Sequence, residues 1–290
     1  MSRYALFLGC LIPMKLPQIE VAARSALARL GLEVEDIEGF SCCPEPWNFK
    51  GTDLDAWLRV AGRNLAVAEK REMDVITLCN GCSATLVEAG HLLGDGGEAA
   101  GEAKKALSAA GLAYRGKVRA AHAVAVLHRE LGREEVERSC SRGLEGLRVA
   151  VHYGCHLLRP SDVMALDDPF TPTFLDGLVE ATGAESLPYD NKMACCGSAV
   201  LDKGISLGMA GDKLAAMEEA GAQCVVVTCP ACFDQFDLGQ VEMGRRGEKH
   251  ALPVLHYFQL LALAQGEDPG RLALSRHKVK VDPVLKAVAR

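Results

Sequence analysis

The chain has 290 residues, of which 49% are hydrophobic and 24% are charged, and its formal net charge is −6. That length can bury the core of one large domain or of two halves, and the negative charge gives no general reason to expect nucleic acid or an anionic membrane as a partner. The apolar start at residues 3–9 lacks the cleavage site of a signal peptide, and the apolar run at 251–264 is too short to span a bilayer. We therefore expect a cytoplasmic protein with no membrane span.

In the first half, short apolar runs typical of strands alternate with segments of helical periodicity. Strands are predicted at residues 3–9, 32–37, 74–78 and 118–121. Helices are predicted at residues 18–30, 53–72, 83–93 and 123–131, with a glycine- and alanine-rich helical excursion at 94–115. Strands that alternate with helices predict a parallel sheet.

The second half repeats this plan after a polar linker at residues 132–147. Residues 148–155 match the opening strand, and 256–261 resemble 122–127. Further strands are predicted at residues 184–189 and 223–228, and helices at 168–182 and 206–220, with Phe170 and Phe174 expected to point inward. The predicted fold class is therefore α/β, with two pseudo-repeated halves at 1–140 and 141–290, each a small, mainly parallel sheet flanked by helices.

Ten of the twelve cysteines form one pattern that occurs twice: a single cysteine, an adjacent pair, and a CysxxCys motif. In the first copy, 31 residues separate the single cysteine from the pair, and 35 separate the pair from the motif. In the second copy these gaps are 39 and 32 residues. The first set comprises Cys10, Cys42, Cys43, Cys79 and Cys82, and the second comprises Cys155, Cys195, Cys196, Cys229 and Cys232.

Four of these cysteines, Cys10, Cys79, Cys155 and Cys229, directly follow predicted strands. The carboxyl ends of strands form the ligand-binding edge of an open α/β sheet, and helix N-termini at that edge favour thiolates. In a reducing compartment, such clusters indicate metal or redox sites and not structural disulfides. Five thiolates exceed the four ligands of a structural zinc ion, so iron–sulfur clusters are favoured, and zinc in one motif remains the alternative.

The repeated cysteine pattern resembles the cysteine-rich, or CCG, domain family. Its occurrence twice in a chain of this length resembles the branch of that family formed by the B subunit of heterodisulfide reductase. The most specific matches are His152-Tyr153-Gly154-Cys155-His156, Ala194-Cys195-Cys196-Gly197, Cys79-Asn80-Gly81-Cys82 and Pro253-Val254-Leu255-His256. Together they span almost the whole chain.

The resemblance implies that each set of five cysteines holds one noncubane [4Fe-4S] cluster, at the carboxyl ends of the strands. It implies that the two clusters face each other across a cavity between the halves, where each sulfur of a disulfide substrate attaches to an iron. Electrons would then arrive through a ferredoxin-like C subunit from a flavin-carrying A subunit. The activity implied is that of an oxidoreductase acting on a sulfur group.

Other functions remain open. Bacterial relatives of this family branch oxidise a carrier-bound thiol or persulfide, and motifs do not set the direction of electron flow. A non-catalytic electron-relay protein with one zinc site is the alternative from another class. The first copy also has Pro44 where the family pattern has glycine, and proline removes a backbone donor. The sequence therefore leaves open whether the two clusters are equivalent.

Histidines are the main candidate functional residues outside the two cysteine sets. His152 and His156 flank Cys155 and are the candidate catalytic residues, as proton donors to a leaving thiolate or hydrogen-bond donors to cluster sulfur, although packed histidines are an equal alternative. His122 and His256 occupy matching repeat positions and are expected at helix starts. The remaining cysteines, Cys140 and Cys224, are expected to be ordinary buried thiols.

Overall fold

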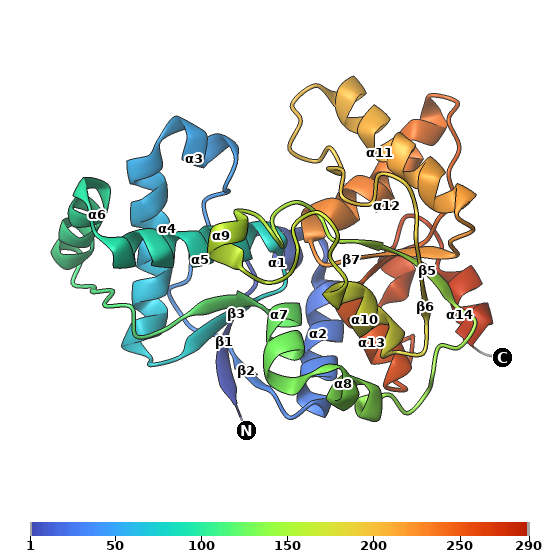
Figure 1. Ribbon diagram of the computed structural model, residues 1–290, viewed down its shortest axis with the longest axis horizontal. Coiled ribbons are helices and arrows are strands. Elements are labelled where there is room, and N and C mark those ends of the chain that lie inside the picture. Colours follow the sequence, from blue (N-terminus) through green and yellow to red (C-terminus); the bar gives the residue numbers. More distant parts are fainter. Residues whose placement is uncertain (1, 289–290) are drawn as a thin grey trace.

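The computed structural model describes residues 2–288 and contains two four-stranded parallel sheets that lie end to end (Figure 1). The first has the order β2-β1-β3-β4, formed by β1 (Arg3–Phe7), β2 (Glu33–Glu35), β3 (Asp74–Thr77) and β4 (Ala120–His122). The second has the same arrangement, β6-β5-β7-β8, formed by β5 (Arg148–His152), β6 (Glu185–Leu187), β7 (Cys224–Val227) and β8 (Val254–His256). The predicted α/β fold with two repeated parallel sheets is confirmed.

The central strands of the two sheets are buried on both faces, which explains their nearly continuous apolar sequences. In β1, the segment after Arg3 is fully buried, and Ala5 pairs with both Glu35 of β2 and Val75 of β3. In β5, Ala150 pairs in the same way with Leu187 of β6 and Val225 of β7. The register of the two sheets is therefore equivalent.

Helices cover both faces of each sheet. Those of the first half are α1 (Leu11–Lys15), α2 (Pro17–Arg29), α3 (Asn48–Thr52), α4 (Leu54–Lys70), α5 (Asn80–Asp95), α6 (Glu98–Ala109), α7 (Ala123–Val126), a π-helical turn (Leu127–Leu131) and α8 (Arg133–Ser139). Those of the second half are α9 (Ser161–Met164), α10 (Phe174–Glu180), α11 (Lys203–Glu219), α12 (Pro230–Arg245), α13 (Tyr257–Ala264), a 3₁₀ turn (Leu274–Arg276) and α14 (Asp282–Val288).

The repeat extends to the start signals of the helices. Helices α4 and α11 each have 17 residues, and each begins after an aspartate whose carboxylate accepts a backbone N–H three residues later, at 2.9 Å. This arrangement satisfies an N–H group that the helix itself leaves without a partner. Asp53 serves α4 and Asp202 serves α11.

The helix predicted over residues 168–182 is shorter in the structure, and Phe170 does not point inward. Helix α10 begins only at Phe174, and Phe170 is 76% exposed. The carboxylate of Asp168 accepts the backbone N–H groups of Phe170 and Thr171, and that of Asp167 accepts those of Thr173 and Phe174. These side chains satisfy the backbone in a turn, which competes with helix formation.

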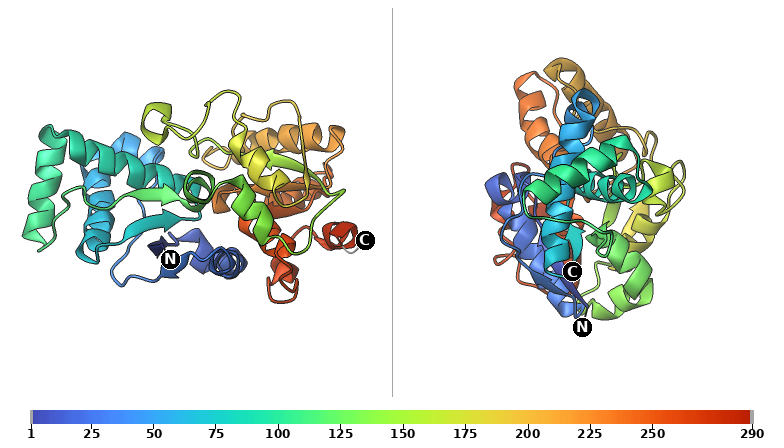
Figure 2. Two further views of the ribbon diagram at one scale, coloured as in Figure 1. Left: turned by 60° about the horizontal axis from the view of Figure 1, so that its bottom comes forward. Right: turned by 90° about the vertical axis from the view of Figure 1, so that its left-hand side faces the viewer.

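The larger of two hydrophobic cores is shared by the two halves, and the second lies wholly within the first half. Helix α2 of the first half packs along α13 of the second, as Figure 1 shows, and residues of both halves belong to the larger buried cluster. Ala22, Ala23 and Ala26 of α2 are fully buried, and small side chains let the helix backbones approach closely. Helix α14 lies at the outer end of the second half (Figure 2). Since the larger core contains residues of both halves, the boundary at residues 140 and 141 stays a prediction.

Reciprocal hydrogen bonds also join the halves where their sheets meet. Nε2 of His122 lies 2.9 Å from the carbonyl oxygen of Thr228, and Nε2 of His256 lies 3.1 Å from that of Leu78. Each imidazole also accepts, through Nδ1, the backbone N–H two residues later at a helix start. The expected placement of both histidines at helix starts is therefore confirmed. Each additionally fixes the strand end that precedes a CysxxCys motif of the other half.

The shared core predicts that the two halves unfold together. Leu261 of α13 is fully buried, so Leu261→Ala is expected to lower the free energy of unfolding by about 2–5 kcal/mol. The matched control is Leu201→Ala, because Leu201 is 89% exposed and its truncation should change stability by less than about 0.5 kcal/mol. Anaerobic denaturation followed by circular dichroism should show one transition, shifted only in Leu261→Ala. Two separate transitions, one of them unshifted, would contradict the shared core.

Candidate metal centre

The local fold places the predicted cysteines at the carboxyl edge of each sheet. Cys10 and Cys79 are the residues that precede α1 and α5, and Cys229 precedes α12. Gly9 and Gly154 connect the central strands to Cys10 and Cys155 with φ angles of +66° and +69°. A Cβ atom at Gly9 would lie 2.7 Å from Sγ of Cys82, so glycine is required both for the turn and for the close approach to a thiol.

The structure brings all ten predicted cysteines into one continuous series of thiols. Within the halves, Sγ of Cys43 lies 3.2 Å from that of Cys82, and Sγ of Cys196 lies 3.3 Å from that of Cys232. The series crosses between the halves where Sγ of Cys79 and Sγ of Cys229 are 3.9 Å apart. Neighbouring thiols extend it outward through Cys42 to Cys10 in the first half and through Cys195 to Cys155 in the second.

Crowding determines which of these thiols can ionise. A hydrogen bond from the Cys155 thiol, with a second from Cys196, lowers the pKa of Cys195 to about 2. In the first half, the neighbouring Cys42 thiol lowers the pKa of Cys43 to about 4. The partners respond in the opposite direction, because the pKa of Cys42 and that of Cys155 are raised beside a thiolate. Full deprotonation of either set therefore requires added positive charge, which bound metal ions supply.

A cavity lies between the halves and opens beside the second set of thiols. Its walls come from both halves, with Trp47, Asn80 and Gly81 on one side and residues near the second cysteine set on the other, namely Cys155, His156, Cys195, Cys196, Ser198, Ala199, Cys229, Ala231 and Cys232. The ring of Trp47 packs against that of His156, with centroids 5.3 Å apart. Nδ1 of His156 lies 3.1 Å from Sγ of Cys155. One candidate histidine thus contacts both a thiol and the opposite half.

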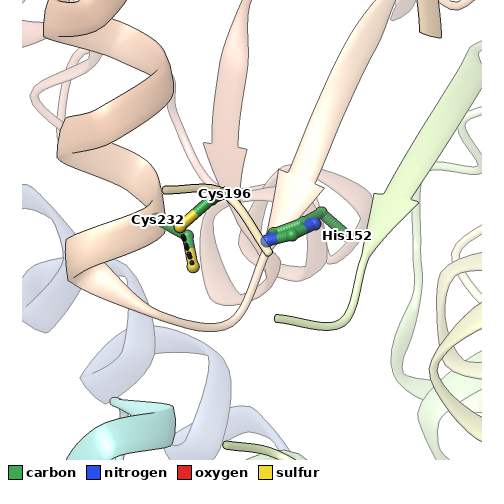
Figure 3. Close-up of side chains that lie close together, drawn as sticks. All are labelled: His152, Cys196 and Cys232. Atoms are coloured by element: carbon green, nitrogen blue, oxygen red, sulfur yellow. Dashed lines mark hydrogen bonds between the residues drawn. The ribbon is translucent and has the colours of Figure 1, made fainter. Parts of the chain in front are cut away.

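The other candidate histidine, His152, is buried beside the second thiol set. Figure 3 shows its imidazole extending from the end of β5 towards Cys196 and Cys232, and the nearest ligand atoms of the three residues all lie within 4.8 Å of one another. The ring packs edge-on against Phe236, and burial lowers its pKa to about 3. Neither ring nitrogen has a hydrogen-bond partner among residues 2–288. A buried polar group without a partner is rare and indicates a functional role or a bound group.

Asn80, which the sequence marked only as part of a motif, joins the two sites. Its side-chain amide donates to the carbonyl oxygen of Tyr153 at 2.7 Å, and its oxygen accepts from the Thr228 hydroxyl at 2.9 Å. Both partners lie next to cysteine loops of the other half, so Asn80 aligns the edges of the two sheets. Its position between Cys79 and Gly81 was the only signal available in the sequence.

Lys213 is a second residue that sequence reasoning missed. Its ammonium group is buried, donates to the carbonyl oxygens of Asn191 and Lys192, and lies near the second thiol set. The helical pattern around it gave no signal, because the lysine occupies a position on the buried face of α11 that apolar residues usually take. Of the two cysteines outside the sets, Cys224 is fully buried in β7, as expected, whereas Cys140 after α8 is only half-buried.

The donor chemistry fits iron–sulfur clusters. Each half supplies five thiols, a soft ligand set that favours zinc or iron–sulfur centres over hard cations. The strand-end loops and helix N-termini around them provide backbone amides, which stabilise thiolates. The first set of five would hold one group and the second set the other, with Cys79 and Cys229 as the point of closest approach.

Comparisons with known proteins agree with this site. A family model described as a cysteine-rich domain (CCG) matches residues 4–87 and 149–237. The chain is 40% identical over 288 residues to the B subunit of the ferredoxin:CoB-CoM heterodisulfide reductase of Methanosarcina mazei, covering 97% of this chain and 95% of that protein. It is 29% identical over 281 residues to the 8-methylmenaquinol:fumarate reductase membrane anchor subunit of Wolinella succinogenes, covering 96% of this chain and 97% of that protein.

The fold also has a counterpart among solved structures. A hypothetical protein from Helicobacter pylori superimposes with a TM-score of 0.77 at 14% identity, over 97% of this chain and 52% of that one, which shows likeness of fold alone. No helix within residues 2–288 combines the length and the apolar composition that crossing a membrane requires. With two matching cysteine-rich segments and a relative that is 40% identical over nearly its full length, the chain belongs to the cysteine-rich CCG domain family, in the branch that contains the B subunit of heterodisulfide reductase.

Proposed function

We propose that the chain is the iron–sulfur catalytic subunit of a heterodisulfide-reductase-like complex, which reduces or forms a disulfide between two noncubane [4Fe-4S] clusters. The observation that carries the proposal is the continuous series of ten thiols, which crosses between the halves at Cys79 and Cys229. Two separate structural metal sites would not need this proximity. Two redox centres that act on one bond do need it.

The clusters, when bound, would supply single electrons and open positions for sulfur. The chain's own residues position the substrate and move protons. Trp47 and His156 pack together at the wall of the cavity, where they border the space that a substrate would enter. Reduction of a disulfide consumes two electrons and two protons to give two thiols. His156, whose Nδ1 lies 3.1 Å from Sγ of Cys155, is the candidate proton donor, and His152 is the candidate hydrogen-bond donor to the second cluster.

The name of the Methanosarcina relative, the B subunit of a reductase, supports a complex of several subunits. From the family resemblance we propose that the partners are a ferredoxin-like C subunit, which delivers the electrons, and a flavin-carrying A subunit, from which they come. The first disulfide to assay is that of CoB and CoM, the pair in the name of the same relative. A cytoplasmic location belongs to this proposal.

One observation favours a second candidate function. The Wolinella relative is named for a fumarate reductase and not for a disulfide substrate. The alternative is therefore a protein that relays electrons, with one motif holding zinc. Membership of a bacterial sulfur-oxidising complex, acting on a carrier-bound thiol or persulfide, would use the same site in the opposite direction.

Metal content tests the two-cluster proposal. We expect anaerobically purified protein to contain roughly eight iron atoms and eight acid-labile sulfides per chain, with little zinc. Cys195→Ser should lose about half of the iron, because it removes one ligand of the second set. Cys224→Ser is the matched control and should keep all of it, since Cys224 is buried in a strand apart from either set. About half the iron together with one zinc ion in the unmodified protein would instead support the relay function.

The role of His156 is tested by kinetics. His156→Asn is expected to lower the kcat of disulfide reduction by about 10²–10⁴-fold, which is the usual contribution of a positioned proton donor. The iron content should not change, because His156 is not among the ten thiols. His250→Asn is the control, since His250 pairs with Glu218 and Glu248 and belongs to neither cysteine motif. An unchanged kcat in His156→Asn, with CoB–CoM heterodisulfide and a reduced viologen as electron donor, would remove His156 from the mechanism.

A further inference from the structure

The two halves correspond position by position, so differences between equivalent residues show how the two thiol sets differ. Phe7 and His152 are each the last residue of the five-residue central strand. Asn64 and Lys213 each occupy the eleventh position of a 17-residue helix. Pro44 and Gly197 each follow the adjacent cysteine pair. In each pair, the two residues occupy the same place in the fold but differ in chemistry.

The largest difference is a buried charge in the second half. Lys213 is only 1% exposed, and its ammonium donates to the carbonyl oxygens of Asn191 at 2.7 Å and Lys192 at 3.2 Å. It also lies 5.5 Å from the centre of the Tyr189 ring. It is the one fully buried lysine or arginine within residues 2–288, and no carboxylate of these residues forms an ion pair with it. Its two hydrogen bonds hold the charge against the loop that stands three to four residues before Cys195. Burial lowers the pKa of Lys213 to about 8, and the thiols of the second set oppose that lowering.

The equivalent position in the first half carries no charge. The side-chain oxygen of Asn64 accepts the backbone N–H of Ser41 at 2.9 Å, and its amide donates to the carbonyl oxygen of Cys42 at 3.1 Å. Asn64 and Lys213 thus both brace the loop that precedes a cysteine pair. Near the first set, the half-buried Lys50 is paired with Glu88, so that its charge is neutralised locally.

Two smaller differences act on the sulfur atoms themselves. His152 directs an imidazole without a partner among the described residues towards Cys196 and Cys232 (Figure 3), whereas Phe7 packs against Phe40 and offers no donor. The backbone N–H of Gly197 lies 3.3 Å from Sγ of Cys195 and donates to it. Pro44 has no N–H to donate at the equivalent position.

All three differences favour additional negative charge in the second half. The reduction potential of an iron–sulfur cluster depends on nearby charge and on hydrogen bonds to its sulfurs. A cation and two extra donors each stabilise the reduced cluster, which carries one more negative charge than the oxidised one. Cys10 and Cys42 are exposed, so water would stabilise negative charge on the first cluster and act in the opposite direction. A full charge at a buried position, however, is screened far less than an exposed charge.

We propose that the two cluster sites differ in reduction potential, with the second set, Cys155 to Cys232, the first to be reduced, and that Lys213 is the positioning residue that sets this order. The inference rests on the proposed two-cluster function. It deepens that function by assigning the first electron from the ferredoxin-type donor to one half. The first half then accepts the second electron at a lower potential.

A redox titration tests the order directly. The full-length chain, purified anaerobically with its iron, is titrated with dithionite and mediator dyes and followed by electron paramagnetic resonance. The signal that Cys155→Ser alters is assigned to the second half. We expect that signal to appear at the higher potential in the unmodified protein. The Lys213→Asn variant places at this position the residue that the first half has there, Asn64. In this variant the ratio of reduced to oxidised second cluster at a fixed potential should fall at least about tenfold, equivalent to about 59 mV for one electron.

The matched variants separate charge from structure. Lys213→Arg keeps the charge and should keep the potential. Lys203→Asn removes an exposed lysine from the same helix, one that pairs with Glu242, and should change neither signal. If the Lys213→Asn variant loses its iron, the order of the two reduction potentials in the unmodified protein still tests the inference. Asn64→Lys is a second test, because it should raise the reduction potential of the cluster in the first half.

Two results would overturn the inference: equal or reversed potentials in the unmodified protein, or an iron-loaded Lys213→Asn variant whose signal does not move. The iron and sulfide content of the same samples is a separate measurement. Too little iron in the unmodified chain for two clusters would contradict the proposed function itself, whereas the order of potentials in a fully loaded chain tests only the inference.

Discussion

The repulsion between closely spaced thiolates is the constraint on which the rest of this structure depends. Ten sulfur atoms gathered at one place cannot all ionise in the protein alone, as the opposite pKa directions of Cys42 and Cys43 illustrate. Because thiolates repel one another, the protein scaffold alone must hold the ten sulfur atoms in place. Parallel sheets help to meet this requirement, because Cys10, Cys79 and Cys229 each lie between a strand end and a helix start, which fix the backbone on both sides. The carboxyl edges of the two sheets then supply thiols from opposite directions.

The same constraint explains why the halves are not independent units. If two sheet edges are to meet at Sγ atoms 3.9 Å apart, their relative position must be fixed to a fraction of that distance. The contact of α2 with α13 provides the bulk of the attachment through a shared apolar core. Asn80, His122 and His256 then determine the alignment, because each hydrogen-bonds a carbonyl group next to a cysteine loop of the other half. Apolar contact supplies stability here, and directional bonds supply register.

The sequence allowed the fold class, the repeat and the cysteine sets to be predicted, because each depends on local patterns. Apolar runs marked the central strands, and two copies of one cysteine spacing marked the site. Local patterns failed where a tertiary contact or a turn decided the outcome. Helix α10 was predicted too long because carboxylates of Asp167 and Asp168 take the backbone N–H groups of that segment. Strand β8 was missed because its residues continue directly into the apolar sequence of α13 and gave no separate signal. Lys213 was missed because a buried cation has no signature in a helical pattern.

The reciprocal bonds of His122 and His256 have a consequence for the way in which this architecture can vary. Each half lacks one imidazole that only the other supplies, so the two copies are always needed in equal number. Two copies of a single half-length chain could also satisfy that need, but every substitution would then appear twice. Covalent linkage guarantees the equal number and removes the need for identity. A lysine can therefore occupy one copy while an asparagine remains in the other, and a symmetric scaffold can carry a polarised site.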